Sequence, residues 1–213
     1  MSRAPRTITL GRATINCRCH VCAFFHSRED EYNVLMPFML EGLLAGDTAI
    51  HILDKDHRAE RIRRLSEHGF EIEDAEQSGQ LDVRSWEDTY LRPGRFDQDA
   101  MMVMLQDLGR SGELRGTGAT RLWANMEWAL VDCLGAYDIL EYESRANDIV
   151  PKYDMAAVCS YDLLKFSAAL MVDVLRTHPQ VIVGGILQEN PFYVPPTEFL
   201  RELESRRSSS RRQ

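Results

Sequence analysis

The chain has 213 residues, of which 44% are hydrophobic and 27% charged, and its formal net charge at pH 7 is −8. This composition is that of an ordinary globular protein and excludes a disordered or fibrous chain. Residues 1–18 hold four arginines and no acid, whereas residues 201–213 hold five arginines and two glutamates. Removing the +7 of these two ends leaves about −15 on the residues between them, which disfavours direct binding of nucleic acid by the body of the protein.

The apolar runs and the number of cysteines indicate the cellular compartment of the protein. No stretch reaches the roughly 18 consecutive apolar residues of a membrane span, and no apolar run follows the first arginines as it would in a secretory signal. The five cysteines are an odd number and fit a reducing compartment better than a disulfide scaffold. We therefore expect a cytoplasmic protein without membrane association.

Hydrophobic periodicity and turn residues predict strands and helices that alternate along the chain. The predicted strands are 20–25, 48–53, 81–86, 120–128, 156–161 and 181–187. The predicted helices are 28–45, capped by Ser27 and bent at Pro37, a charged helix through 68, then 96–108, 134–150, 163–176 and a short one from 197. A turn is expected at Pro93-Gly94 and a loop at the glycines from 109 to 118, while residues 1–17 form a basic arm and 204–213 a disordered basic tail.

Six strand–helix alternations predict an α/β domain whose mostly parallel central sheet carries helices on both faces. Ligands of such sheets bind beyond the carboxyl ends of the strands. The side chains expected there combine apolar rings with polar groups, and this mixture suits a small organic ligand with polar handles. The aromatic members are Phe24, Phe25, Trp86, Trp128 and Tyr161, and the polar ones are His20, Glu127 and Asp162.

The turn after the first strand excludes the usual phosphate loop. It reads FFHSREDEYN, with neither glycine nor lysine and with three consecutive acids that would repel a triphosphate. No serine–histidine–acid order and no paired carboxylates stand out elsewhere. We therefore expect neither an enzyme nor a bound cofactor.

A group of sulfur and imidazole side chains, Cys17, Cys19, His20 and Cys22, has the residue types of metal ligands. On a regular strand, however, Cys17 and Cys19 face one side and His20 and Cys22 the other. The favoured interpretation is that Cys22 is a small core residue and that the other two cysteines are incidental. A cysteine-based metal or redox sensor is kept as an alternative.

Seven short motifs in order resemble the MEDS domain, a sensory domain of methanogen and methylotroph regulators. They are HVCAFF at 20–25, Pro37-Phe38 with GLLAGD at 42–47, ANMEWAL at 124–130, YESRAN at 142–147, CSYD at 159–162, THP at 177–179 and NPFYVPP at 190–196. The resemblance covers about residues 18–203. It implies a RecA/KaiC-like three-layer fold without the phosphate loop, and a sensory role proposed to involve small hydrocarbon derivatives.

By motif position, the resemblance adds residues on a helix and in the last loop to the predicted site. Phe25 departs from the family, which often has tyrosine there. Since no segment is typical of an output domain, we expect signalling through a partner protein or output domain in trans, or through homo-oligomers; the alternative is a ligand-free interaction module. The predicted ligand site comprises His20, Cys22, Phe24, Phe25, Glu127, Trp128, Tyr142, Glu143, Asn147, Cys159, Tyr161, Asp162 and His178.

Overall fold

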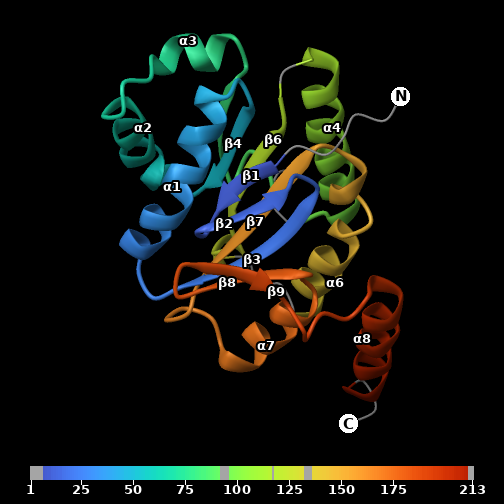
Figure 1. Ribbon diagram of the computed structural model, residues 1–213. Coiled ribbons are helices and arrows are strands. Elements are labelled where there is room, and N and C mark those ends of the chain that lie inside the picture. Colours follow the sequence, from blue (N-terminus) through green and yellow to red (C-terminus); the bar gives the residue numbers. More distant parts are fainter. Residues whose placement is uncertain (1–6, 92–95, 117, 132–135, 211–213) are drawn as a thin grey trace.

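A computed structural model describes residues 7–91, 96–116, 118–131 and 136–210 (Figure 1). Its centre is a sheet of seven strands in the order β5-β4-β6-β7-β3-β8-β9. The strands are β3 (Cys19–Phe25), β4 (Thr48–Leu53), β5 (Leu81–Ser85), β6 (Thr120–Asn125), β7 (Met155–Asp162), β8 (Gln180–Val183) and β9 (Ile186–Glu189). All neighbours pair in parallel except β8 and β9. The predicted α/β class with a mostly parallel sheet is confirmed.

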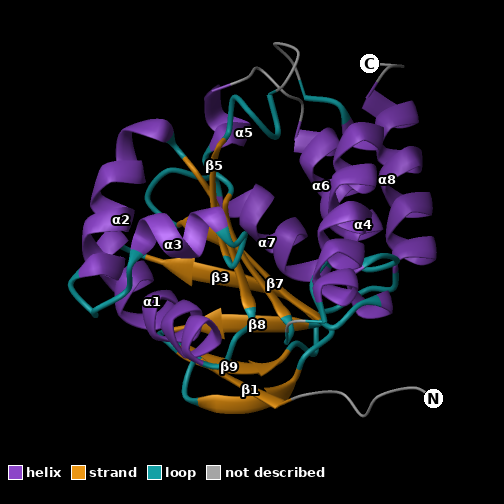
Figure 2. Cartoon of the chain, turned by 90° about the horizontal axis from the view of Figure 1, so that it is seen from above, coloured by secondary structure: helices purple, strands orange, loops and turns teal. Residues whose placement is uncertain are grey.

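Helices cover both faces of this sheet (Figure 2). One face carries α1 (Arg28–Leu44), α2 (Arg58–Ser66) and α3 (Ile72–Gln77). The other carries α4 (Gln98–Arg115), α5 (Trp128–Val131), α6 (Ala136–Ala146), α7 (Ala168–Arg176) and α8 (Pro196–Ser210). Two 3-10 helices, η1 (Lys55–His57) and η2 (Val150–Lys152), complete the connections. Because both faces are covered, the central strands are continuous apolar runs, and all seven residues of β3 are buried.

Several predicted boundaries were wrong. Helix α4 runs on to Arg115 and includes Gly109 and Gly112, which were predicted to lie in a loop. At Gly109 the Tyr153 ring packs directly on the helix backbone, and a Cβ there would lie 2.3 Å from the ring. The predicted strand 181–187 is a hairpin, turned by Gly184 and Gly185 at positive φ. The strand predicted to Trp128 ends at Asn125, and the helix predicted from 163 begins at Ala168.

The two ends of the chain also differ from expectation. Within the predicted basic arm, β1 (Thr7–Leu10) and β2 (Ala13–Asn16) form an antiparallel hairpin, because Ile8 and Leu10 pack into the core beside α1. Within the predicted tail, α8 continues to Ser210. Arg207 anchors its last turns by donating to Asp138 at 2.5 Å. The turn predicted at Pro93-Gly94 and the start of the helix predicted from 134 lie outside the described residues.

No helix among the described residues is long and apolar enough to cross a bilayer.

Candidate functional site

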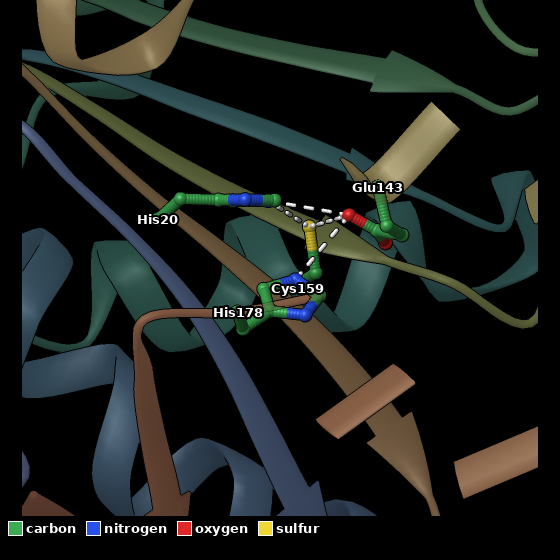
Figure 3. Close-up of side chains that lie close together, drawn as sticks. All are labelled: His20, Glu143, Cys159 and His178. Carbon is green, nitrogen blue, oxygen red and sulfur yellow. Dashed lines mark hydrogen bonds and ion pairs between the residues drawn. The ribbon is translucent and has the colours of Figure 1, made fainter. Parts of the chain in front are cut away.

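Four polar side chains meet in the core between the sheet and α6. They are His20 from β3, Glu143 from α6, Cys159 from β7 and His178 from the link between α7 and β8 (Figure 3). One ligand-type atom from each lies within 4.8 Å of the others. The exposed fraction of each residue is at most 4%. We call these four residues the buried cluster.

Strand register explains why these residues meet. Strand β3 pairs with β7 so that Cys22 lies opposite Cys159 and His20 opposite Ala157. His20 and Cys159 are therefore diagonal neighbours on one face of adjacent strands, which brings long side chains within reach. His178 precedes β8, the other neighbour of β3. These four predicted residues thus come together in the core, away from the carboxyl edge at which the predicted site was expected.

The contacts within the buried cluster centre on the Glu143 carboxylate. Its Oε2 atom lies 3.2 Å from His20 Nε2 and 3.3 Å from His178 Nε2. The Cys159 sulfur lies 3.5 Å from that oxygen and 3.5 Å from His20 Nε2. The other carboxylate oxygen accepts a hydrogen bond from the Tyr161 hydroxyl. Glu143 is fully buried.

Asn147 sets the orientation of the His20 ring. Its amide nitrogen donates to three backbone carbonyls, the shortest contact being 2.7 Å to Thr177. The amide oxygen therefore faces His20 Nδ1 at 3.2 Å and must accept from it. Since Nδ1 carries a proton, Nε2 presents its lone pair to Glu143 and Cys159 when the ring is neutral.

His178 is held in the same way. Its Nδ1 lies 2.9 Å from the carbonyl oxygen of Val174, which can only accept a hydrogen bond, so Nδ1 donates. Its Nε2 then points at the buried cluster, and this buried atom has no hydrogen-bond partner. The two imidazole rings lie against each other with their centroids 4.2 Å apart.

The charges in the buried cluster are strongly coupled. Burial opposes ionisation of Glu143, but the two histidines outweigh it and hold the pKa of this carboxyl well below its usual range. Burial and the neighbouring His178 lower the pKa of His20. For His178, burial is outweighed by the Cys22 sulfur and Glu143, which raise its pKa well above the usual value. One carboxylate beside a single protonated histidine accounts for these opposite directions. The pKa of Cys159 is raised to about 12 by burial and by Glu143.

The alternative metal set predicted near the first strand is not assembled. Cys17 and Cys19 pack on the α1 side of the sheet, whereas His20 and Cys22 face α6 and α7. Burial raises the pKa of both Cys17 and Cys19 to about 12, so these thiols are neutral. The Cys22 thiol lies 3.8 Å from the carbonyl oxygen of Gln180 and next to His178. Only His20 of this set belongs to the buried cluster.

The carboxyl edge of β3, β6 and β7 holds the other predicted acids. Glu127 and Asp162 line a hollow of about 60 Å³ together with Phe25 and Tyr161. This volume is about that of two water molecules, each of which takes about 30 Å³. Lys165 closes the hollow by donating to Glu127 at 2.6 Å and lying 3.6 Å from Asp162. Glu127, predicted as a polar ligand-binding group, is thus paired with a lysine at the edge of the sheet.

A larger hollow lies beside it, at the carboxyl ends of β3 and β8. Its volume is about 300 Å³, at the lower end of the range for ligand pockets. The walls combine the phenyl rings of β3 with charged and amide groups. They are Arg12, Phe24, Phe25, His26, Asp30, Asn33, Val34, Gly184 and Gly185.

Two predicted residues lie apart from both places. Trp128 is fully buried and stacks on Tyr90, with ring centroids 4.5 Å apart. Tyr142 meets Tyr90 edge to face and is hydrogen-bonded to its hydroxyl at 3.5 Å. They pack in the core under α4. Lys165 and Arg12 also line these hollows and were not predicted, since no periodicity marks an exposed loop side chain as facing a hollow.

The fold and the site define an α/β domain built around buried imidazole, thiol and carboxylate groups. The chain belongs to the MEDS family, described as the MEthanogen/methylotroph, DcmR Sensory domain, whose profile matches residues 19–179. Membership of this family of sensory domains supports a sensory or regulatory role for the chain.

Individual proteins also show a similarity to the chain. The transcriptional repressor DcmR of Methylorubrum extorquens is 24% identical over 160 residues, which cover 75% of this chain and 57% of that protein. The chain therefore spans little more than half the length of this relative. The flagellar accessory protein FlaH of Methanocaldococcus jannaschii has a TM-score of 0.49 at 10% identity, over 80% of this chain and 75% of FlaH.

Proposed function

We propose that the chain is a cytoplasmic sensor that binds a small organic molecule and controls transcription through a partner protein. The ligand is a hydrocarbon derivative of a few carbon atoms with a polar group. It binds in the hollow between β3, β8 and α1, and the domain itself performs no catalysis. The similarity to a transcriptional repressor supports the output, and the family supports the sensory role.

The observation that carries this proposal is the lining of the 300 Å³ hollow. Phe24 and Phe25 provide apolar contact, while Arg12 and His26 provide polar anchors of the kind that orient a ligand. The hollow lies at the carboxyl ends of β3 and β8, and it borders the edge at which β3 and its other neighbour β7 are followed by helices on opposite faces of the sheet, α1 and α7. In open α/β sheets such a change of side marks the place where ligands bind.

The proposal is tested by thermal-shift and calorimetric screening of the wild-type chain against short alcohols, aldehydes, halides and carboxylates. At least one class is expected to raise the melting temperature in a saturable way, because a ligand that binds only the folded state stabilises it. Val34→Trp is expected to abolish this shift by filling the hollow from α1. A matched control is Leu44→Trp, which adds the same indole at an exposed position outside the hollow on the same helix. A shift that survives Val34→Trp would refute this placement.

A further inference from the structure

The four atoms that meet in the buried cluster are all electron donors. They are His20 Nε2, His178 Nε2, Glu143 Oε2 and Cys159 Sγ. Because Nδ1 of each ring donates an outer hydrogen bond, Nε2 of each ring in its neutral form directs a lone pair inward. Burying such groups together is unfavourable unless a proton or a cation lies between them. His178 Nε2 is the clearest sign, since it is fully buried, faces the other three and has no hydrogen-bond partner.

Four of the six distances between these atoms match those between the ligands of one tetrahedral metal ion, and all six are within 4.8 Å. Metal bonds of about 2.0 Å to nitrogen or oxygen and about 2.3 Å to sulfur place tetrahedral ligands about 3.3 to 3.6 Å apart. The contacts of Glu143 Oε2 measure 3.2 Å to His20, 3.3 Å to His178 and 3.5 Å to Cys159. The sulfur lies 3.5 Å from His20 Nε2.

We propose that His20, Glu143, Cys159 and His178 bind one divalent transition-metal ion, with zinc as the best match. Sulfur and imidazole donors favour zinc and related transition metals over magnesium or calcium, which require oxygen ligands. Cys159 binds as the thiolate after its proton passes to solvent. The thiolate and the Glu143 carboxylate then balance the charge of the ion, so that the filled site is neutral, as a buried site requires.

Outer contacts support the ligands as they do in known metal sites. Asn147 and the carbonyl oxygen of Val174 each bind the Nδ1 atom of one histidine, and the Tyr161 hydroxyl binds the free carboxylate oxygen. Such partners fix the ring and the tautomer of a ligating histidine. Four protein ligands leave no open position, which is typical of a structural ion. The ion would join β3, α6, β7 and the α7–β8 link.

The test uses cobalt(II), which reports on its ligands by absorption. The full chain is unfolded with a chelator under reducing conditions, refolded and titrated with Co²⁺. The wild type is expected to bind one equivalent, with visible bands of tetrahedral cobalt and a near-ultraviolet band of thiolate-to-cobalt charge transfer. Zinc is expected to displace the cobalt. A wild type that folds and binds no stoichiometric metal would overturn the proposal, whatever the variants do.

Two thiol variants assign the sulfur. Cys159→Ser is expected to lose the charge-transfer band and to weaken binding by more than the roughly 100-fold that the loss of an outer partner costs. Cys19→Ser removes another buried thiol, on the opposite face of the sheet, and is expected to leave the charge-transfer band and the metal affinity unchanged. A charge-transfer band that persists in Cys159→Ser, or one that disappears in Cys19→Ser, would refute the assignment. Circular dichroism checks the fold of each variant, and Glu143→Gln provides a second ligand variant.

Discussion

At the scale of single residues, Asn147 connects the helix that supplies Glu143 to the ring of His20. Its three donated hydrogen bonds leave only the amide oxygen for His20 Nδ1. The Asn147 side chain does not belong to the buried cluster itself, yet it determines which nitrogen of the His20 ring faces the cluster. We therefore regard Asn147 as a positioning residue.

Asn147→Ala is expected to weaken cobalt binding by about 10- to 100-fold while the charge-transfer band remains, because the four ligands stay in place and only the ring orientation loosens. Absorption titration measures this change. Asp148→Ala, at the exposed neighbouring position, serves as the control. Unchanged affinity in Asn147→Ala would show that the amide does not orient the ring.

The Cys19 thiol, which lies on the opposite face of the sheet from the buried cluster, leads to a prediction about how stability depends on pH. Burial, together with the nearby Cys17, raises the pKa of this thiol from 9.0 to about 12. The folded protein therefore keeps a proton that the unfolded chain loses, so the free energy of unfolding falls as the pH rises from about 9 towards 12. Cys19→Ala is expected to show a smaller fall over this range in urea unfolding. Parallel curves for both proteins would contradict the account.

At the scale of elements, Arg121 at the start of β6 binds α1 by a hydrogen bond and the turn after α1 by a buried ion pair. Arg121 donates to Asp47 at 2.8 Å and to the carbonyl oxygen of Phe38 at 2.6 Å. Its stem crosses α1 at Gly42, where a Cβ would lie 2.4 Å from Arg121 Cδ. This close approach explains the glycine and the aspartate of the GLLAGD motif.

Gly42→Ala is expected to lower the free energy of unfolding by about 1–3 kcal/mol, because the pinned arginine cannot move away from the added methyl group. Chemical denaturation measures this loss. Gly46→Ala is not a suitable control because Gly46 has a positive φ, whereas Leu44→Ala changes an exposed residue at the end of the same helix. An unchanged Gly42→Ala protein would show that α1 and Arg121 separate freely.

Helix α8 packs through its apolar face. Phe199 and Leu203 are buried in the core with α6 and α7, whereas Arg207 pairs with acids of α6 at the surface. Phe199→Ala is expected to cost about 3–5 kcal/mol of unfolding free energy, and Arg207→Ala less than about 1 kcal/mol. Equal costs in denaturant titrations would mean that the ion pairs, and not the apolar face, hold this helix.

The particular elements show what local sequence can and cannot predict. Strands such as β3 were predictable because both faces are buried and the run is apolar apart from His20. The strand predicted at 181–187 was wrong because two adjacent glycines form a turn inside an apolar run. The length of α8 was underestimated because the arginines and serines near its end are typical of a disordered tail, although Phe199 and Leu203 earlier in the helix pack into the core. His178 could be named only from the resemblance, since neither spacing nor periodicity predicts that this loop residue meets Glu143 of α6 beside β3 and β7.

At the scale of the whole molecule, the sheet separates two kinds of site. The buried cluster lies in the middle of the face under α6 and α7, and the hollow proposed for the organic ligand lies at the carboxyl edge beside α1. Tyr161 contacts both regions, because its hydroxyl binds Glu143 and its ring lies 6.0 Å from that of Phe24. Tyr161→Phe is expected to preserve the packing and to cost about 1–3 kcal/mol by leaving the Glu143 oxygen unpaired.

Native mass spectrometry of the full chain, purified under reducing conditions without chelator, tests the metal site most directly. We expect a folded species whose mass exceeds that of the chain by one transition-metal ion, and a Cys159→Ser protein without this addition. A folded wild type at the mass of the bare chain, even after refolding with zinc, would contradict the account and leave the buried cluster a network of hydrogen bonds and one ion pair.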